Sequence, residues 1–380
     1  MISQNNNMEE DFKCNVLIMG KTGTGKSSLL NYICDTDLAE TGAGKPVTGE
    51  GIYEYNVRIN GQDVRIFDSW GIEAGKVDRW KHLIDESLHE HGVQKSMEDW
   101  FHSVIYCIQA GGGRVEDIDA EIIKKFLGEG YLLTVVLTKA DQVDEEDESR
   151  MKQVILNEIK STLPPSRRKA SINIIATCAE KKKTRSGETQ PFGKDAVQQS
   201  ILEGWKSTVI ERIPKHVVSR LVGCVDDWED DEKKKLLNSE ISGVTERNEA
   251  IYNEIKADAE DFSKNDIPGL CKEIMSDAVE SCQKADASIR KTFNIELEGL
   301  KDNKEKEEDM AWWEWLIAIP TLPIAWVGMK VSEWIRSNSE KHISKETHRI
   351  EHYIETIAGH LRGQCAKLEP HIAKELKRIF

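Results

Sequence analysis

The segment from Gly20 to Ser27 constrains the fold of this chain more than any other part of its sequence. It reads Gly-Lys-Thr-Gly-Thr-Gly-Lys-Ser and matches the pattern G-x-x-x-x-G-K-S/T. An apolar run at residues 14–19 precedes it, and a helical run at 27–33 follows. Glycines let backbone N–H groups converge on a phosphate, and a helix N-terminus adds partial positive charge. The pattern therefore predicts a strand-loop-helix unit that binds the phosphates of a nucleotide.

Two side chains of this segment have predicted chemical roles. Lys26 is placed to reach the β- and γ-phosphate oxygens, and the Ser27 hydroxyl is placed to ligate Mg²⁺. The alternative is a glycine turn that only caps a helix, and the strand before the loop disfavours it. The predicted nucleotide-binding residues here are Gly20, Lys21, Thr22, Gly23, Thr24, Gly25, Lys26, Ser27 and Ser28.

The pattern of apolar and polar residues up to residue 214 predicts an α/β domain. Short β-branched runs alternate with amphipathic stretches, which is typical of a parallel sheet covered by helices. Asn60-Gly61 favours a tight hairpin, so the two strands that flank it are expected to be antiparallel. We predict a mostly parallel six-stranded sheet with strands at 14–19, 52–59, 63–67, 103–109, 132–137 and 172–176. The predicted helices include 116–127, 144–163 and 195–212.

After Pro214 the sequence predicts an all-α domain. Apolar residues recur at steps of three and four, which is the spacing of a helix stripe. The two stripes are Leu237, Ile241, Val244, Ile251, Ile255 and Ile343, Ile350, Ile354, Ile357, Leu361. Pro268-Gly269 and Glu369-Pro370 are expected to separate helices. The predicted organisation is a lead-in at 1–12, an α/β domain at 13–214 and a helical domain at 215–380.

Two motifs narrow the class of nucleotide. Asp68-Ser69-Trp70-Gly71 has the form D-x-x-G, and Thr138-Lys139-Ala140-Asp141 has the form N/T-K-x-D. A carboxylate at Asp141 can accept hydrogen bonds from N1–H and N2–H₂ of guanine, which adenine cannot supply. In these motifs the chain resembles the Era-like GTPases of the translation-factor-related class, to which the 50S-ribosome-binding GTPases belong.

The resemblance implies GTP or GDP with Mg²⁺ as the bound species, and a P-loop GTPase domain as the fold. Asp68 would hold Mg²⁺ through water, the Gly71 N–H would contact the γ-phosphate, and the Lys139 stem would pack on the base. Thr177-Cys178-Ala179 lies where the family has S-A-K and would offer backbone N–H groups to the guanine O6. By resemblance, therefore, Thr138, Lys139, Asp141, Thr177, Cys178 and Ala179 are base-side residues.

The family also needs a threonine in its first switch, whose hydroxyl completes the Mg²⁺ and γ-phosphate shell. Thr48 is the predicted residue, with Thr41 and Thr36 as alternatives. The predicted catalytic set is thus Lys26, Thr48 and Gly71, and the predicted metal set is Ser27, Thr48 and Asp68.

The chain departs from many small GTPases at the position after D-x-x-G. That position holds Ile72 instead of the glutamine that orients the attacking water. Gly23 replaces the asparagine through which some relatives recruit K⁺. We therefore expect slow intrinsic hydrolysis that a homodimer of G domains or a protein partner stimulates.

Composition restricts the partners and the compartment. The net charge of −15 disfavours nucleic acid and broad docking on anionic membranes. The cysteines number 8 and form no C-x-x-C pair, which indicates reduced thiols in a cytoplasmic protein. The polar N-terminus lacks the apolar core of a signal peptide.

A tryptophan-rich apolar segment at 311–334 leaves a membrane role open. It carries five of the chain's 10 tryptophans, but Pro320 and Pro323 interrupt it. A bent insertion like that of dynamin-like GTPases, with peripheral membrane association, is one hypothesis. A helix-turn-helix corner inside the helical domain is favoured, because the segment is short and broken.

Three functions therefore compete. The first is a GTP-hydrolysing switch whose helical domain oligomerises or binds a partner according to nucleotide state. The second is a membrane-associated GTPase that uses 311–334, and the third is a scaffold that holds GTP without hydrolysing it. The G domain also resembles prophage-borne and immunity-related GTPases, with G-x-T-G-x-G-K-S-S at Gly20 to Ser28.

Overall fold

A computed structural model describes residues 13–38, 51–59, 62–73, 75–111, 115–162, 172–184, 187–238, 245–281 (with single gaps at 272, 275 and 279) and 347–379. The described residues form two compact units, which divide between Arg212 and Ile213. The lead-in at 1–12, the hairpin turn at 60–61 and the segment 311–334 lie outside the described residues. The domain boundaries predicted above stay predictions.

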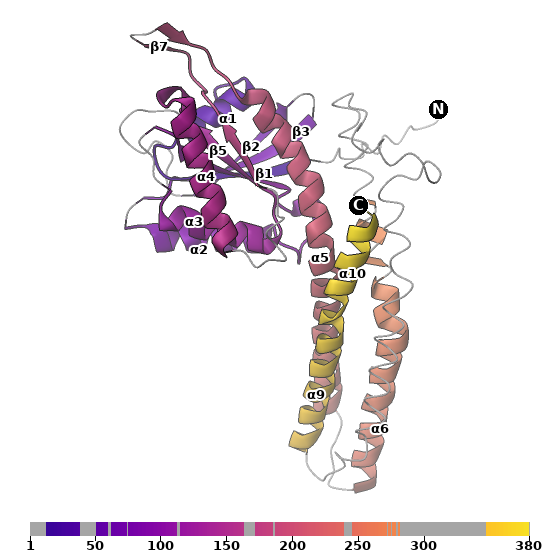
Figure 1. Cartoon of the computed structure of the whole chain (residues 1–380). Coiled ribbons are helices and arrows are strands. Elements are labelled where there is room, and N and C mark those ends of the chain that lie inside the picture. The colour runs from indigo at the N-terminus through magenta and orange to yellow at the C-terminus, as the bar shows by residue number, and fades with distance from the viewer. Residues whose placement is uncertain are drawn as a thin grey trace, which may run out of the picture. The chain divides into compact units, whose positions relative to one another are not determined.

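The first unit is built on a six-stranded sheet of order β2-β3-β1-β4-β5-β6 (Figure 1). The strands are β1 (Cys14–Gly20), β2 (Ile52–Ile59), β3 (Gln62–Ser69), β4 (Ser103–Gln109), β5 (Leu133–Thr138) and β6 (Asn173–Ala176). β2 pairs antiparallel with β3, and every other pairing is parallel. The mostly parallel sheet with one antiparallel strand is thus confirmed.

Helices cover the sheet because its central strands are apolar on both faces. Every residue of β1 is buried. The helices are α1 (Lys26–Cys34), α2 (Val77–Glu90), α3 (Asp117–Glu129), α4 (Glu145–Thr162) and the first part of α5 (Lys194–Asn238). α2 and α3 are neighbours, joined by the ion pair between Lys81 and Glu121. α1 and α5 are neighbours through Gln198, whose amide donates to the Ile33 carbonyl.

One small element was missed from the sequence. β7 (Lys182–Thr184) and β8 (Gly187–Thr189) pair antiparallel and form a separate two-stranded sheet between β6 and α5. Short 3₁₀ turns, η1 (Met97–Asp99) and η2 (Ala140–Gln142), precede β4 and follow β5.

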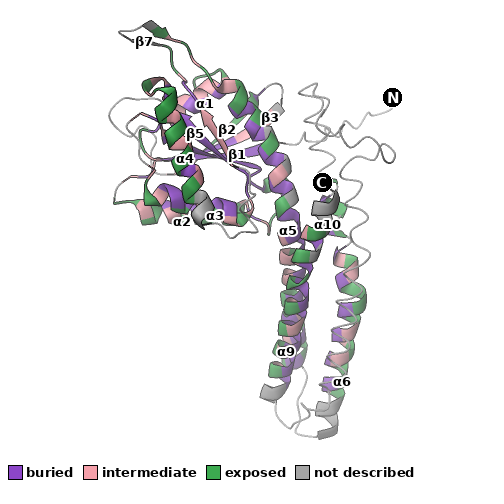
Figure 2. Ribbon diagram, viewed as in Figure 1, coloured by how far each residue is buried: buried purple, intermediate pink, exposed green. Residues whose placement is uncertain are grey.

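The second unit is a bundle of the later part of α5, α6 (Thr245–Asp261) and α9 (Thr347–Ala366), followed by α10 (Leu368–Ile379). The predicted stripe on α9 is confirmed where it is described, since Ile350, Ile354, Ile357 and Leu361 are fully buried. Figure 2 shows buried residues along the length of α9. The stripe was wrong at Leu237, which is 77% exposed while its neighbour Leu236 is buried.

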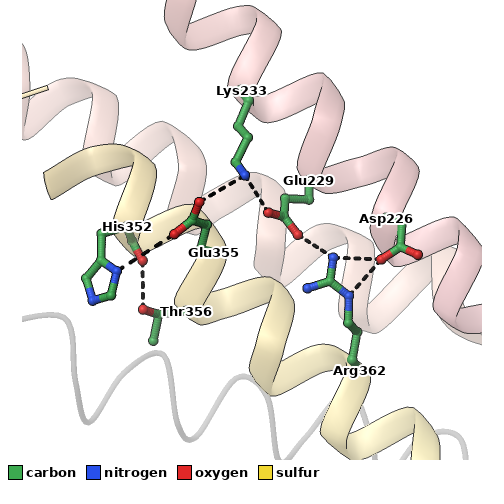
Figure 3. Close-up of polar contacts among 7 residues, drawn as sticks. All are labelled: Asp226, Glu229, Lys233, His352, Glu355, Thr356 and Arg362. Carbon is green, nitrogen blue, oxygen red and sulfur yellow. Dashed lines mark hydrogen bonds and ion pairs between the residues drawn. The ribbon is translucent and has the colours of Figure 1, made fainter. Parts of the chain in front are cut away.

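Charged side chains join α5 to α9 along the bundle (Figure 3). Lys233 of α5 lies 3.1 Å from Glu355 of α9. Arg362 of α9 reaches back to Asp226, at 2.6 Å, and to Glu229 on α5. These contacts fix which face of α9 meets α5, and the apolar stripe beneath them supplies the buried area.

The helix ends predicted near proline are only partly correct, because the helix predicted at 195–212 continues well beyond residue 212. α5 runs through Pro214 as a helix of 45 residues, although proline removes one helix hydrogen bond. The apolar residues Val209, Ile213 and Val217 lie four apart on both sides of Pro214 and are all buried, so packing holds the helix together. A new helix does begin at Leu368, which places Pro370 in its first turn, where no N–H is needed.

At Pro268 the predicted break is replaced by a change of helix type. A π-helical turn, η4 (Phe262–Asp266), precedes it, and the Ile267 N–H donates to the Phe262 carbonyl five residues back. The wider turn adjusts the backbone just where a proline lacks its N–H. The backbone is again helical from residue 267 to 271.

No described helix combines the length and the apolar character that crossing a bilayer requires.

Candidate functional site

The loop between β1 and α1 lies at the carboxyl edge of the parallel strands, where ligands of such sheets bind. Gly25 precedes α1 with φ 88°, a left-handed conformation that favours glycine. α1 begins at Lys26, so its free N–H groups open toward the loop. The predicted strand-loop-helix unit is therefore present.

Lys26 is held under this loop by backbone carbonyls. Its Nζ lies 3.0 Å from the Gly20 oxygen and 3.1 Å from the Lys21 oxygen. The residue is only 7% exposed. Burial lowers the pKa of the Lys26 ammonium, and the nearby Asp68 carboxylate opposes that shift. The ammonium is thus fixed in a dry position beneath the loop, where a phosphate would meet it.

Asp68 lies beside Lys26 because β3 runs parallel to β1, with Asp68 in register with Ile18. The carboxylate is fully buried, and neither oxygen has a hydrogen-bond partner among the described residues. Burial raises the pKa of Asp68 to about 6, although Lys26 acts in the opposite direction. Burying a carboxylate without hydrogen-bond partners costs free energy. This position is therefore suited to binding a group that the protein itself does not supply.

The D-x-x-G segment is hydrogen-bonded directly to the loop. The Thr22 N–H donates to the Ile72 carbonyl at 3.1 Å, and the Ile72 N–H donates to the Gly20 carbonyl at 3.2 Å. A Cβ on Gly71 would overlap the Thr22 backbone and hydroxyl. Glycine at 71 is therefore required by close approach, and the segment cannot shift without moving the loop.

The base-side motifs contact the same loop. Lys139 has φ 53° and extends its Nζ to the Gly23 carbonyl at 2.8 Å and to Gln109 Oε1 at 3.1 Å. The Thr138 hydroxyl donates to the Thr24 carbonyl. One carboxylate oxygen of Asp141 is buried without a partner among the described residues. The motif is therefore fixed against the loop while Asp141 keeps an unused acceptor.

Backbone hydrogen bonds hold the next loop beside this motif. The Thr177 N–H donates to the Leu137 carbonyl at 2.8 Å, and the Ala140 N–H donates to the Thr177 carbonyl at 3.0 Å. Cys178 is buried and bridges to Phe192, and its thiol lies 3.2 Å from the Glu180 carbonyl. Cys178 thus has a packing role that does not depend on its thiol reaching a ligand.

The structure brings together the predicted residues of all four segments, namely the 20–28 loop, Asp68 with Gly71, 138–141 and 177–179. Their roles as ligands stay predictions. Thr48 and Thr41 lie outside the described residues, and Thr36 is exposed just beyond the end of α1. Ile72 is 6% exposed and its carbonyl is bonded to Thr22, so its side chain belongs to the core.

Sequence reasoning missed Asp119, Tyr106 and Gln109. Asp119 contacts the loop through Lys21, and Gln109 contacts Lys139. The one local signal was the spacing of Glu116 and Asp119, which form a reciprocal capping box at the start of α3.

The chain is also similar in sequence to known proteins. Residues 15–139 match the family model described as 50S ribosome-binding GTPase. The chain carries a P-loop GTPase domain. Among curated relatives of this domain, the tRNA modification GTPase MnmE of Ureaplasma parvum is 31% identical over 37% of this chain and 28% of its own length. Cell division control protein 10 of Candida albicans is 22% identical over 41% of this chain and 49% of its own length.

The chain therefore spans about half or less of the length of these curated relatives of the P-loop GTPase domain. Among solved structures, Toc33 from Arabidopsis thaliana in complex with GDP and Mg²⁺ is 19% identical, with a TM-score of 0.39. That match covers 51% of this chain and 84% of the Toc33 chain.

Proposed function

We propose that the chain is a GTP-binding and GTP-hydrolysing switch whose helical domain responds to nucleotide state by oligomerisation or partner binding. The observation that carries the proposal is Asp68. Its buried carboxylate has no partner among the described residues and lies beside the buried ammonium of Lys26. A site for a metal-bound triphosphate accounts for both buried charges. The Asp68 carboxylate would gain the partner that it lacks, and the Lys26 ammonium, which only backbone carbonyls hold in the described part of the chain, would gain an anion.

The residues present fit Mg²⁺ and the phosphates. The Ser27 hydroxyl at the start of α1 would ligate the ion, Asp68 would hold it through water, and Thr48 is the proposed switch residue. Lys26 would contact the β- and γ-phosphate oxygens, and the N–H groups of residues 23–28 would surround the phosphates. Bound Mg²⁺ would supply neutralisation of the charge that develops between the β- and γ-phosphates.

The proposed specificity for guanine depends on Asp141. Its unused acceptor is held at a fixed distance from the phosphate loop, because Lys139 and Thr138 of the same motif are bonded to that loop. A fixed carboxylate acceptor selects a base edge with two donors, as guanine has. The backbone N–H groups of Cys178 and Ala179 are the proposed partners of O6.

Hydrolysis is proposed to be slow in the isolated chain. The position that orients water in many GTPases is Ile72, which is buried in the core. The Gly71 N–H and Lys26 can stabilise charge on the transferring phosphoryl group, but neither activates or orients the water. A second G domain or another protein is the proposed source of that function, and the helical domain is the proposed means of bringing it near.

The proposal predicts a specific pH dependence of Mg²⁺-nucleotide binding. Asp68 must be ionised to hold the ion, and its pKa without ligand is about 6. Below pH 6 the Asp68 carboxyl is protonated and must release its proton before Mg²⁺ binds. The affinity for Mg²⁺-nucleotide should therefore fall about tenfold for each pH unit from this group alone. The measurement is the Kd of Mg²⁺ with a fluorescent GDP from pH 5 to 8, for the wild type and Asp68→Asn.

The nucleotide's own titration affects both proteins equally, so only the difference between their curves reports Asp68. Below pH 6 we expect the wild-type curve to be steeper than the Asp68→Asn curve, by about one log unit of Kd per pH unit. Parallel curves over the whole range would contradict a direct role for Asp68 in the metal shell.

A further inference from the structure

Lys21, the second residue of the phosphate loop, is anchored outside the loop by its side chain. Its Nζ lies 2.6 Å from Oδ2 of Asp119 and 3.1 Å from Oε2 of Glu116, both at the start of α3. The Asp119 side chain is only 2% exposed, whereas that of Lys21 is 24% exposed. The loop is thus tied to α3 by an ion pair with one buried member.

Asp119 is saturated with donors from separate parts of the domain. Besides Lys21, its carboxylate accepts the Tyr106 hydroxyl of β4 at 2.7 Å and the Glu116 N–H at 2.8 Å. Burial and the neighbouring carboxylate raise the pKa of Tyr106, so its hydroxyl stays protonated and donates. A buried carboxylate with one cation and two further donors has a fixed position, and loss of the cation would leave it uncompensated.

The backbone of Lys21 lies at the centre of the phosphate site. Its carbonyl accepts Lys26 Nζ at 3.1 Å and also the Thr24 hydroxyl at 2.8 Å. Lys21 is also paired, as a parallel bridge, with Ile72. The residue that Asp119 holds therefore positions both the ammonium under the phosphates and the segment that carries Gly71.

We propose that Asp119 is a positioning residue for the phosphate site, acting through Lys21 to hold Lys26 and Gly71 in register with the β- and γ-phosphates. This inference rests on the proposed function, since it assumes that a triphosphate occupies the loop. The effect is expected to be larger for a triphosphate than for a diphosphate. The Gly71 N–H would contact only the γ-phosphate, which a diphosphate lacks. The N–H groups of the loop would contact phosphates that the triphosphate and the diphosphate share.

The test compares Asp119→Asn, Lys21→Met and the double variant with the wild type. Dissociation constants for GDP and for the non-hydrolysable analogue GMPPNP, both with Mg²⁺, are measured by displacement of a fluorescent GDP. We expect each single variant to shift the GMPPNP-to-GDP affinity ratio about tenfold against GMPPNP, since small misplacements at such sites carry large effects. The double variant should shift it no further, because both changes break one connection.

Two controls separate positioning from general damage. Lys21→Arg keeps a cation within reach of Asp119 and should shift the ratio less than Lys21→Met does. Glu121 lies on α3, as Asp119 does, and forms an exposed ion pair with Lys81 of α2. Glu121→Gln removes that ion pair and should leave the affinity ratio unchanged. A wild-type ratio in Asp119→Asn, or multiplied effects in the double variant, would overturn the inference.

The inference and the proposed function fail in different ways. A wild-type protein that binds neither guanine nucleotide would refute both. Normal binding with an unchanged ratio in the variants would refute only the role of Asp119. Because the ratio is a binding measurement, it is informative even if the wild type hydrolyses no GTP.

Discussion

Replacing Lys26 with alanine is expected to reduce nucleotide affinity about a thousandfold, to the point where binding is lost at micromolar protein. The ammonium is 7% exposed and held by the Gly20 and Lys21 carbonyls beneath the loop. Its removal would delete the proposed charge-assisted contacts to two phosphates, each worth about 1.5–3 kcal/mol. The measurement is a fluorescence titration with a labelled GDP in excess Mg²⁺.

A matched control is Lys152→Ala. Lys152 lies on α4, where its ion pair with Glu148 is within one helix. It should bind nucleotide as the wild type does, and circular dichroism should show both variants folded. Wild-type affinity in folded Lys26→Ala would show that the loop does not hold phosphates.

Asp141→Asn is expected to change the base that the site prefers. The variant would lose the proposed acceptor for the two guanine donors, and its amide would offer a donor that suits the 2-oxo group of xanthine. Sites that depend on such hydrogen bonds discriminate by roughly 10⁴-fold, so we expect GTP affinity to fall at least about a hundredfold. The measurement is competition of GTP and xanthosine triphosphate against a labelled nucleotide.

Asp147→Asn is the control, since Asp147 is an exposed residue at the start of α4 that pairs with Arg150. It should keep the wild-type preference for GTP. Unchanged GTP affinity in Asp141→Asn would remove the basis for assigning guanine.

The parts of the site that the sequence predicted depend on short-range order. The phosphate loop and the strand-end motifs are each encoded within a few residues. Glycine positions and alternating apolar runs fix them locally. The register of β3 on β1, which brings Asp68 beside Lys26, follows from the parallel sheet that those runs predict.

What the sequence could not show are contacts between distant residues. Lys21 and Asp119 are 98 positions apart, and no pattern links them before the fold is known. The same holds for Gln109, which reaches Lys139 from the end of β4. Asp119 belongs to a helix cap and Gln109 to the end of a strand. Their contacts with Lys21 and Lys139 form only when the domain packs.

In the helical half, the sequence analysis gave too much weight to the local effect of proline on a helix. Proline disfavours helix interiors by about 3 kcal/mol, which led us to expect a break at Pro268. The helix predicted at 195–212 also ended before Pro214. Buried side chains on both sides of Pro214 outweigh that cost, and the π-helical turn before Pro268 adapts the backbone. Leu237 was misassigned to the stripe because Leu236 beside it fits almost the same spacing.

Single-turnover hydrolysis of GTP across a range of protein concentrations shows whether this chain is a GTP-hydrolysing switch that needs a second G domain or a partner. With Ile72 buried, we expect slow hydrolysis in the dilute chain. The first-order rate constant should rise, in step with oligomeric mass, as concentration increases or a partner is added. Fast hydrolysis in the dilute monomer would contradict the need for help, and no hydrolysis at any concentration or with any partner would contradict the switch itself.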